Sequence, residues 1–123
     1  MQKVQGFGGF FFRAANPGLL AAWYEKHLGI NPVPTSVEEQ PWQTGGGATV
    51  FAPFPEDTDY FGDPNKQFML NFRVADLAAM VAQLRDQGVQ VEDEVEMEGI
   101  GAFARIHDPE GNPIELWQPE GDA

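Results

Sequence analysis

The two halves of this chain repeat one order of features, and this repeat limits the possible folds more than any other property. FFR at 11–13 corresponds to NFR at 71–73, and Gly29 corresponds to Gly88 at the end of a second helical segment. The offset is about 60 residues, and a repeat at a fixed offset indicates that one structural unit occurs twice. Each half reads as a strand, a helix and three antiparallel strands. The repeat therefore predicts an α+β fold of two tandem βαβββ modules.

In the first half, an aromatic strand is followed by a capped helix. The apolar stretch FGGFFFRA at 7–14 is too short for a helix and predicts a strand. Asn16 is a suitable N-cap and Pro17 fits the first helical position, and the helix that they begin should end at Gly29. After three successive glycines, the apolar ATVFAPF at 48–54 predicts a strand of a wide hairpin.

The second half predicts the same order of elements. QFMLNFRV at 67–74 reads as a strand, and Asp76 caps a helix that ends at Gly88. VQVEDEVEME at 89–98 alternates between apolar and polar residues, as a half-buried strand does. Two more strands, GAFARIH and PIELWQP, are joined by a turn at 108–112 that contains Pro and Gly.

The length of 123 residues suits a single domain. We expect one domain over 1–123, with module 1 at about 5–56, a loop at 57–66 and module 2 at about 67–119. One helix in each module covers one face of its sheet, so the other faces of a curved mixed sheet should enclose a cleft. This cleft is the predicted functional site.

The charge of the chain excludes some partners. Seven Lys and Arg residues against 19 Asp and Glu residues give a net charge of -12, which repels phosphate backbones and anionic lipid. We therefore expect no nucleic-acid partner and no membrane partner. The sequence has neither an apolar run of membrane-spanning length nor a signal-peptide pattern, which predicts a cytoplasmic location. Without cysteine, a thiol nucleophile is excluded.

Three segments carry a resemblance to a known family: AAWYEKHLGI at 21–30, LNFRVADLAAMVAQLRDQGV at 70–89 and HDPEGNPIELWQP at 107–119. Together they resemble the vicinal oxygen chelate superfamily, which includes glyoxalases, bleomycin-resistance proteins and extradiol dioxygenases. The resemblance covers nearly the whole chain and implies the tandem modules. It also implies a homodimer, because a second copy can cover the exposed sheet edges that the paired halves leave.

The resemblance further implies a metal site, with one ligand on the first and last strand of each module. Glu115 fits the last-strand position of the second half. The three other positions have no ligand side chain and are occupied by Gly9 or Gly8, Val50 or Phe51, and Met69 or Phe68. A divalent ion generally needs three or more donors, so we expect no complete metal site and no cofactor. The alternative is a site completed by donors across a dimer interface.

Strand alternation assigns the side chains that should line the cleft with Glu115. The other candidate ligand-binding residues are Phe11, Arg13, Met69, Asn71, Arg73 and Trp117, and Trp42 is a candidate lid together with Tyr60 and Phe61. Burial favours the neutral form of an unpartnered carboxylate, so either Arg13 or Arg73 neutralises Glu115 or it stays protonated. An ion pair that only holds two sheets together is the structural alternative. The two histidines, His27 and His107, are predicted to lie on the surface.

Three functions remain open from the sequence. The first is a binding protein that holds a small aromatic or amphipathic molecule in the cleft, as the resemblance to bleomycin-resistance proteins implies. The second is a glyoxalase-like lyase, isomerase or dioxygenase, either metal-dependent or with Glu115 as a catalytic general base. The third is a protein-interaction or structural module with a filled cleft, because a fold does not determine a function.

Overall fold

Side-chain caps begin both helices of the structure, a computed structural model that describes residues 1–121. In α1 (Pro17–Leu28), Asn16 Oδ1 accepts a hydrogen bond from the Leu19 amide at 3.1 Å, and in α2 (Leu77–Asp86), Asp76 Oδ1 accepts one from the Ala79 amide at 3.0 Å. Such caps satisfy amide groups that have no partner inside the helix. Gly29 ends α1 with a φ of 72°, which favours glycine.

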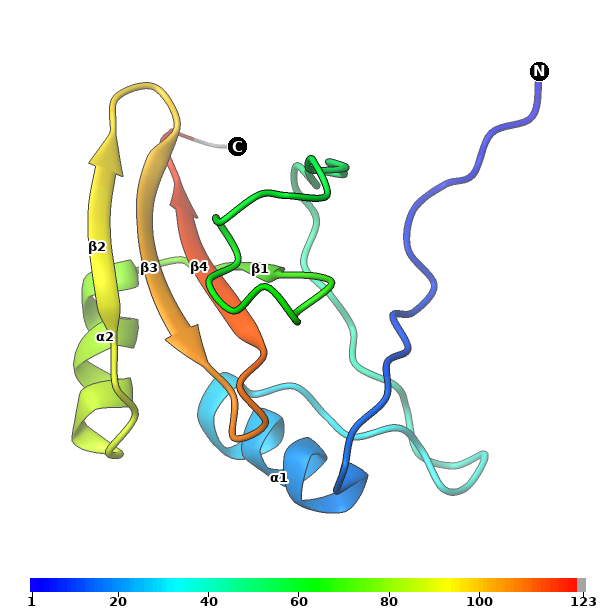
Figure 1. The fold of residues 1–123 in the computed structure, drawn as a ribbon. Helices are drawn as coiled ribbons and strands as arrows, with labels where there is room; N and C mark the ends of the chain where they lie inside the picture. The colour runs from blue at the N-terminus through cyan, green and yellow to red at the C-terminus, as the bar shows by residue number, and fades with distance from the viewer. Residues whose placement is uncertain (122–123) are drawn as a thin grey trace.

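Four strands form one mixed sheet, so the predicted α+β fold class is confirmed (Figure 1). The strands are β1 (Leu70–Arg73), β2 (Glu92–Met97), β3 (Gly101–His107) and β4 (Pro113–Pro119). Their spatial order is β1-β4-β3-β2. β1 pairs with β4 in parallel, and the other two pairs are antiparallel. The second half of the chain therefore has the predicted order of strand, helix and three strands.

The hydrophobic core lies between the sheet and the two helices. Ile114 and Leu116 of β4 are fully buried, as the alternation within this strand predicts, and Ile106 of β3 lies beside them. The core cluster consists of Leu20, Tyr24, Leu77, Val81, Leu84, Val91, Ala104, Ile106, Ile114 and Leu116. Burial of these apolar side chains, at about 25 cal/mol per Å², holds the helices on one face of the sheet. The opposite face is left for other contacts.

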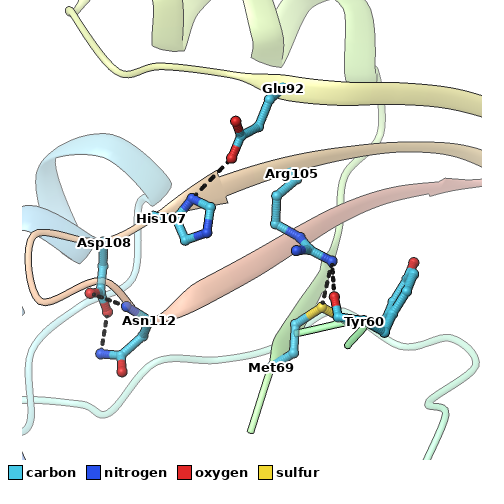
Figure 2. Close-up of polar contacts among 7 residues, drawn as sticks. All are labelled: Tyr60, Met69, Glu92, Arg105, His107, Asp108 and Asn112. Carbon is cyan, nitrogen blue, oxygen red and sulfur yellow. Dashed lines mark hydrogen bonds and ion pairs between the residues drawn. The ribbon is translucent and has the colours of Figure 1, made fainter. Parts of the chain in front are cut away.

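The turn between β3 and β4 is held by Asp108, which is 4% exposed. Its carboxylate accepts hydrogen bonds from the amides of Glu110 (2.9 Å) and Asn112 (3.0 Å), from Asn112 Nδ2 (2.7 Å) and from the Tyr24 hydroxyl of α1 (2.6 Å). The contact between Asp108 and Asn112 is visible in Figure 2. Burial, and then the hydrogen bond to Asp108, raises the pKa of the Tyr24 hydroxyl above its ordinary value. This turn fastens α1 to the sheet.

The strands predicted at 7–14 and 48–54 are wrong for this structure. Within residues 1–121, both segments lack regular secondary structure, and the N-terminal segment, blue in Figure 1, runs away from the sheet. A strand needs a neighbour for its main-chain hydrogen bonds, and neither segment has one among the described residues. The cleft expected between the open faces of two modules is not found in the described residues either, because only the second module contributes strands to the sheet.

The half-buried strand predicted at 89–98 is shorter and more exposed than its alternation indicates. All six residues of β2 are exposed, although Val91 just before it is buried. A register shift between Glu92 and Val95, with Asp93 at a φ of 54°, interrupts the alternation. β2 is an edge strand, and its acidic side chains discourage pairing with other chains.

Candidate ligand-binding site

The face of the sheet opposite the helices carries two rows of side chains that the strand register brings together. In the first row, Glu115 of β4 lies between Asn71 of β1 and Arg105 of β3. In the second row, Trp117 lies between Arg73 and Phe103. Residues directly opposite each other on neighbouring strands are close enough to interact. This face therefore has a polar row beside an aromatic row, and we call it the open face.

Glu115 accepts hydrogen bonds from two neutral donors, whereas the sequence predicts an arginine partner or a protonated side chain. It is 8% exposed, and its Oε1 accepts a hydrogen bond from Asn71 Nδ2 at 2.8 Å. Its Oε2 accepts one from the Tyr60 hydroxyl. Arg73 lies two register pairs further along the strands and donates to the main-chain carbonyls of Gly45 (3.0 Å) and Ala48. The register thus explains why Asn71, and not Arg73, contacts the carboxylate.

Tyr60 lies over the polar row, although it belongs to the segment between the two halves. The guanidinium carbon of Arg105 lies 5.3 Å from the centre of the Tyr60 ring, and the Phe54 ring stacks on Tyr60 at 5.8 Å and 14°. The hydrogen bond to Glu115, followed by burial, raises the pKa of the Tyr60 hydroxyl, and Arg105 opposes this shift. The open face is thus partly covered by the chain itself.

Arg105 connects this segment to the sheet but has one buried donor without a partner among the described residues. Its Nη2 donates to the Tyr60 carbonyl at 2.9 Å and contacts Met69 Sδ at 3.2 Å, as Figure 2 shows. Its Nε is buried and has no hydrogen-bond partner among the described residues. Burying a donor without a partner costs about 1–3 kcal/mol. An acceptor that reached this nitrogen would therefore be favoured.

The aromatic row is a pair of stacked rings. Trp117 and Phe103 are almost parallel, with ring centres 6.1 Å apart and 3° between the planes. The Trp117 indole nitrogen donates to the Ile100 carbonyl at 3.0 Å, which fixes the ring. A side chain at Gly101, whose φ is 135°, would come within 2.9 Å of that nitrogen, so only glycine fits there. The two parallel rings thus form an apolar pair in the row next to Glu115.

The structure brings some of the predicted site residues together and separates others. Met69, Asn71, Arg73 and Trp117 lie on or beside the open face with Glu115. Phe11 is 93% exposed, Arg13 is exposed, and Trp42 packs on the core residue Phe72 at 6.1 Å and 77°. A small cavity of about 70 Å³ beside Trp42 is lined by Leu28, Ile30, Phe72, Arg73, Val74, Met80 and Leu116. Trp42 therefore does not lie over Glu115.

Sequence reasoning missed Arg105, although a signal was present. The two strands of the predicted hairpin, joined by a turn at 108–112, already imply that Arg105 lies opposite Glu115. The prediction of surface positions holds for His107, which is exposed and contacts Glu92 at 3.3 Å, but it is wrong for His27. His27 is buried, and its Nδ1 contacts Gln87 at 2.7 Å, because α1 turns this side chain toward the end of α2.

The residues around Glu115 do not fit a divalent metal ion. The positions that would supply further ligands hold glycine, valine, methionine or phenylalanine, and the groups in contact with Glu115 are a phenol and an amide nitrogen. No group of three His, Asp or Glu side chains that could hold a metal ion occurs among residues 1–121. Divalent ions in proteins need several N or O donors held together. One carboxylate among these neighbours does not make such a site.

Comparisons with known proteins place the chain in a family. The model of the glyoxalase-like domain matches residues 9–117. The chain belongs to this glyoxalase-like family. The vicinal oxygen chelate superfamily is thus confirmed, as the three sequence segments implied. A comparison with curated proteins found no match. In the part of the chain that the structure describes, neither helix is long and apolar enough to cross a bilayer.

Three solved structures of this fold are similar to the glyoxalase-like chain. TnmS3, an antibiotic binding protein from Streptomyces sp. CB03234, is 22% identical with a TM-score of 0.68, and the match covers 98% of this chain and 100% of that one. A protein from the mobile metagenome of V. Pseudocholerae is 20% identical with a TM-score of 0.66, and the match covers 98% of this chain and 99% of that one. A bleomycin resistance determinant encoded on the transposon Tn5 is 20% identical with a TM-score of 0.57 over 88% and 92%. At these identities the likeness shows the fold.

Proposed function

We propose that the protein binds a small planar aromatic or amphipathic molecule on the open face, without a complete catalytic metal site. The observation that carries this proposal is the stacked pair Trp117 and Phe103 beside the buried carboxylate of Glu115. Binding sites for small molecules typically combine apolar walls with a few polar groups that fix the orientation of the ligand. The antibiotic-binding and bleomycin-resistance proteins of the same fold support a binding role.

The ligand must enter beneath the segment that covers the open face. Trp117 is 9% exposed, and Tyr60 together with the loop held by Arg73 lies over its surroundings. This segment has no helix or strand, and Tyr60 is 47% exposed. Segments with few buried contacts open at low free-energy cost. We infer that the segment moves outward when the ligand binds and then covers it.

Calorimetric titration with a panel of planar aromatic compounds tests this proposal. We expect at least one compound to bind in a 1:1 ratio, and Trp117→Leu to weaken its binding about tenfold because a stacking partner is lost. Trp42→Leu is the matched control, since Trp42 packs on Phe72 on the helix side. Dialysis against a chelator should leave the affinity unchanged. Equal losses in both variants, or a stoichiometric metal ion bound by Glu115, would contradict the proposal.

The enzymatic alternative uses Glu115 as a general base or a metal ligand. Its test is turnover of 2-oxoaldehyde–glutathione adducts and of catechols, with and without added metal, by the wild type and by Glu115→Gln. A binding protein predicts no turnover in either form. Turnover that depends on Glu115 would make the protein an enzyme and overturn the binding proposal.

We also propose that the working unit is a homodimer in which the first module, about residues 5–56, completes its strands against a second copy. Large apolar side chains of this region are exposed: Phe7 at 64%, Phe11 at 93% and Phe51 at 78%. Exposed apolar side chains in such number are typical of a surface that a partner covers. The outer edge of β1 also has no strand beside it among the described residues.

The oligomeric state tests the homodimer directly. Size-exclusion chromatography with light scattering at several protein concentrations should give the mass of a dimer. Phe11→Asp should shift the population toward the monomer, because it places a charge in the proposed interface. Val95→Asp, on the exposed strand β2 of the second module, is the control. A monomer at all concentrations would contradict this proposal.

A further inference from the structure

Tyr60 occupies a set of contacts that suits a ligand better than a loop residue. Its hydroxyl donates to Glu115 Oε2, its ring faces the guanidinium of Arg105 at 5.3 Å, and Phe54 stacks on it at 5.8 Å. A carboxylate acceptor, a cation and an aromatic ring around one phenol are recognition elements for a hydroxylated aromatic ring. The contacts of the Tyr60 side chain thus indicate which kind of ligand group this site can bind.

Two partners of Tyr60, Glu115 and Arg105, lie on strands of the sheet, whereas Tyr60 does not. Glu115 is 8% exposed, lies in the middle of the sheet and is held from the other side by Asn71. Arg105 is on the neighbouring strand and opposite Glu115 in the register. Tyr60 itself is 47% exposed and lies in a segment without helix or strand. A ligand can therefore take the place of Tyr60 without disturbing the sheet.

The buried Nε of Arg105, which has no partner among the described residues, adds a second requirement. Tyr60 offers its main-chain carbonyl to Nη2, but its side chain has no acceptor that satisfies Nε. A ligand that carries an oxygen acceptor on or beside its aromatic ring can fill this position. The unused donor is an independent sign that the site is completed by something other than Tyr60.

We propose that the ligand of the open face is a phenolic aromatic molecule that displaces Tyr60, gives its hydroxyl to Glu115 and places its ring against Arg105. This inference rests on the proposed binding function and adds the chemical class of the ligand. Tyr60 is then a competitor within the chain that keeps Glu115 hydrogen-bonded until the ligand arrives. The carboxylate of Glu115 selects the neutral phenol, because it repels a phenolate.

Matched ligands test the role of the hydroxyl. Binding of 2-naphthol, 2-methoxynaphthalene and naphthalene is measured by calorimetry with the full chain. We expect 2-naphthol to bind about tenfold more tightly than its methyl ether, since a hydrogen bond to a charged acceptor is lost in the ether. In Glu115→Gln this preference should shrink to about twofold or less. A preference for the ether, or an equal preference in both proteins, overturns the inference.

Matched variants test the competition. Tyr60→Phe keeps the ring but removes the hydroxyl that occupies Glu115, so 2-naphthol should bind about threefold to tenfold more tightly. Glu56→Gln, an exposed residue near the start of the same segment, is the control and should bind as the wild type does. Weaker binding in Tyr60→Phe would make Tyr60 a wall of the ligand site and overturn the inference. Circular dichroism confirms the fold of each variant.

The outcomes separate this inference from the proposed function. If the three naphthalene compounds bind equally and Trp117→Leu weakens all of them, the open face binds aromatic molecules but is not selective for phenols. If no compound binds to the wild type or to Tyr60→Phe, and the wider aromatic panel is also silent, the proposed function fails with it.

Discussion

Two buried carboxylates in this protein each accept a hydrogen bond from a tyrosine, and their surroundings are very different. Asp108 accepts from two amides, one side-chain amide and Tyr24, and all these groups belong to α1 or to the turn between β3 and β4. Glu115 accepts from two side chains, Asn71 and Tyr60. Tyr24 is 7% exposed, whereas Tyr60 is 47% exposed. The first cluster is part of the fold, and the second can exchange one of its members.

The largest effect is expected at Asp108. Asp108→Ala leaves the Tyr24 hydroxyl and several donors of the turn without an acceptor in a buried region, which should lower the free energy of unfolding by about 3 kcal/mol. Chemical denaturation measures this value. Asp63→Ala is the control, because Asp63 accepts a hydrogen bond in an exposed turn, and it should change stability by less than about 0.5 kcal/mol. If the two variants changed the free energy of unfolding equally, the structural role assigned to Asp108 would be wrong.

A smaller effect is expected for the hydroxyl of Tyr24. Tyr24→Phe removes one of four donors to Asp108, so the free energy of unfolding should fall by about 1–2 kcal/mol. Tyr60→Phe removes a donor to the buried Glu115, but Asn71 still contacts this carboxylate and Tyr60 is half-exposed, so the loss should be smaller, about 0.5–1 kcal/mol. Thermal or chemical unfolding of both variants gives the comparison. A larger loss for Tyr60→Phe would show that the Glu115 cluster is the more important one for folding.

The wild type and Tyr24→Phe should also differ in how their stability depends on alkaline pH. Burial and Asp108 raise the pKa of the Tyr24 hydroxyl in the folded state. The stabilisation that this shift gives the folded state is therefore fully present below the ordinary pKa of tyrosine, about 10, and is lost as pH rises through the folded-state pKa. The unfolded state releases this proton first, so the free energy of unfolding should decrease as pH rises above about 10. In Tyr24→Phe the decrease should be less steep. An unchanged slope would show that Tyr24 is not the group concerned.

A small effect on stability is also expected at Arg105. Arg105→Lys keeps the charge but removes the planar group against the Tyr60 ring, and it should change the free energy of unfolding by less than about 1 kcal/mol. Its affinity for 2-naphthol should nevertheless fall severalfold. If Arg105→Lys is stable and binds 2-naphthol with unchanged affinity, Arg105 does not contribute to ligand binding.

Both helices and the strands of the second half could be predicted from the sequence because their signals are local. The caps at Asn16 and Asp76, the alternation of β4 and the turn at 108–112 all depend on neighbouring residues, and the structure has each of them. The strands expected at 7–14 and 48–54 depend on a neighbouring strand that the described chain does not provide. The aromatic composition of a segment predicts that it can form a strand, but it does not identify the strand with which that segment would pair.

The site was predicted in part for the same reason. Alternation and repeat position placed Asn71, Glu115 and Trp117 on one face, because strand geometry is regular. Alternation could not show that Asn71 and Tyr60 hold the carboxylate in place of an arginine, since this depends on the register and on the path of an irregular segment. Trp42 was expected to cover the cleft, but its ring packs on Phe72 on the helix side of the sheet.

Fluorine NMR can detect directly a ligand that binds on the open face. The three tryptophans of the chain can be labelled as 5-fluorotryptophan and followed by fluorine NMR during titration with 2-naphthol. Only Trp117 lies on the open face, so its resonance should shift while those of Trp23 and Trp42 stay constant. A shift confined to Trp42 or Trp23, with the Trp117 resonance unchanged at saturation, would contradict binding on the open face.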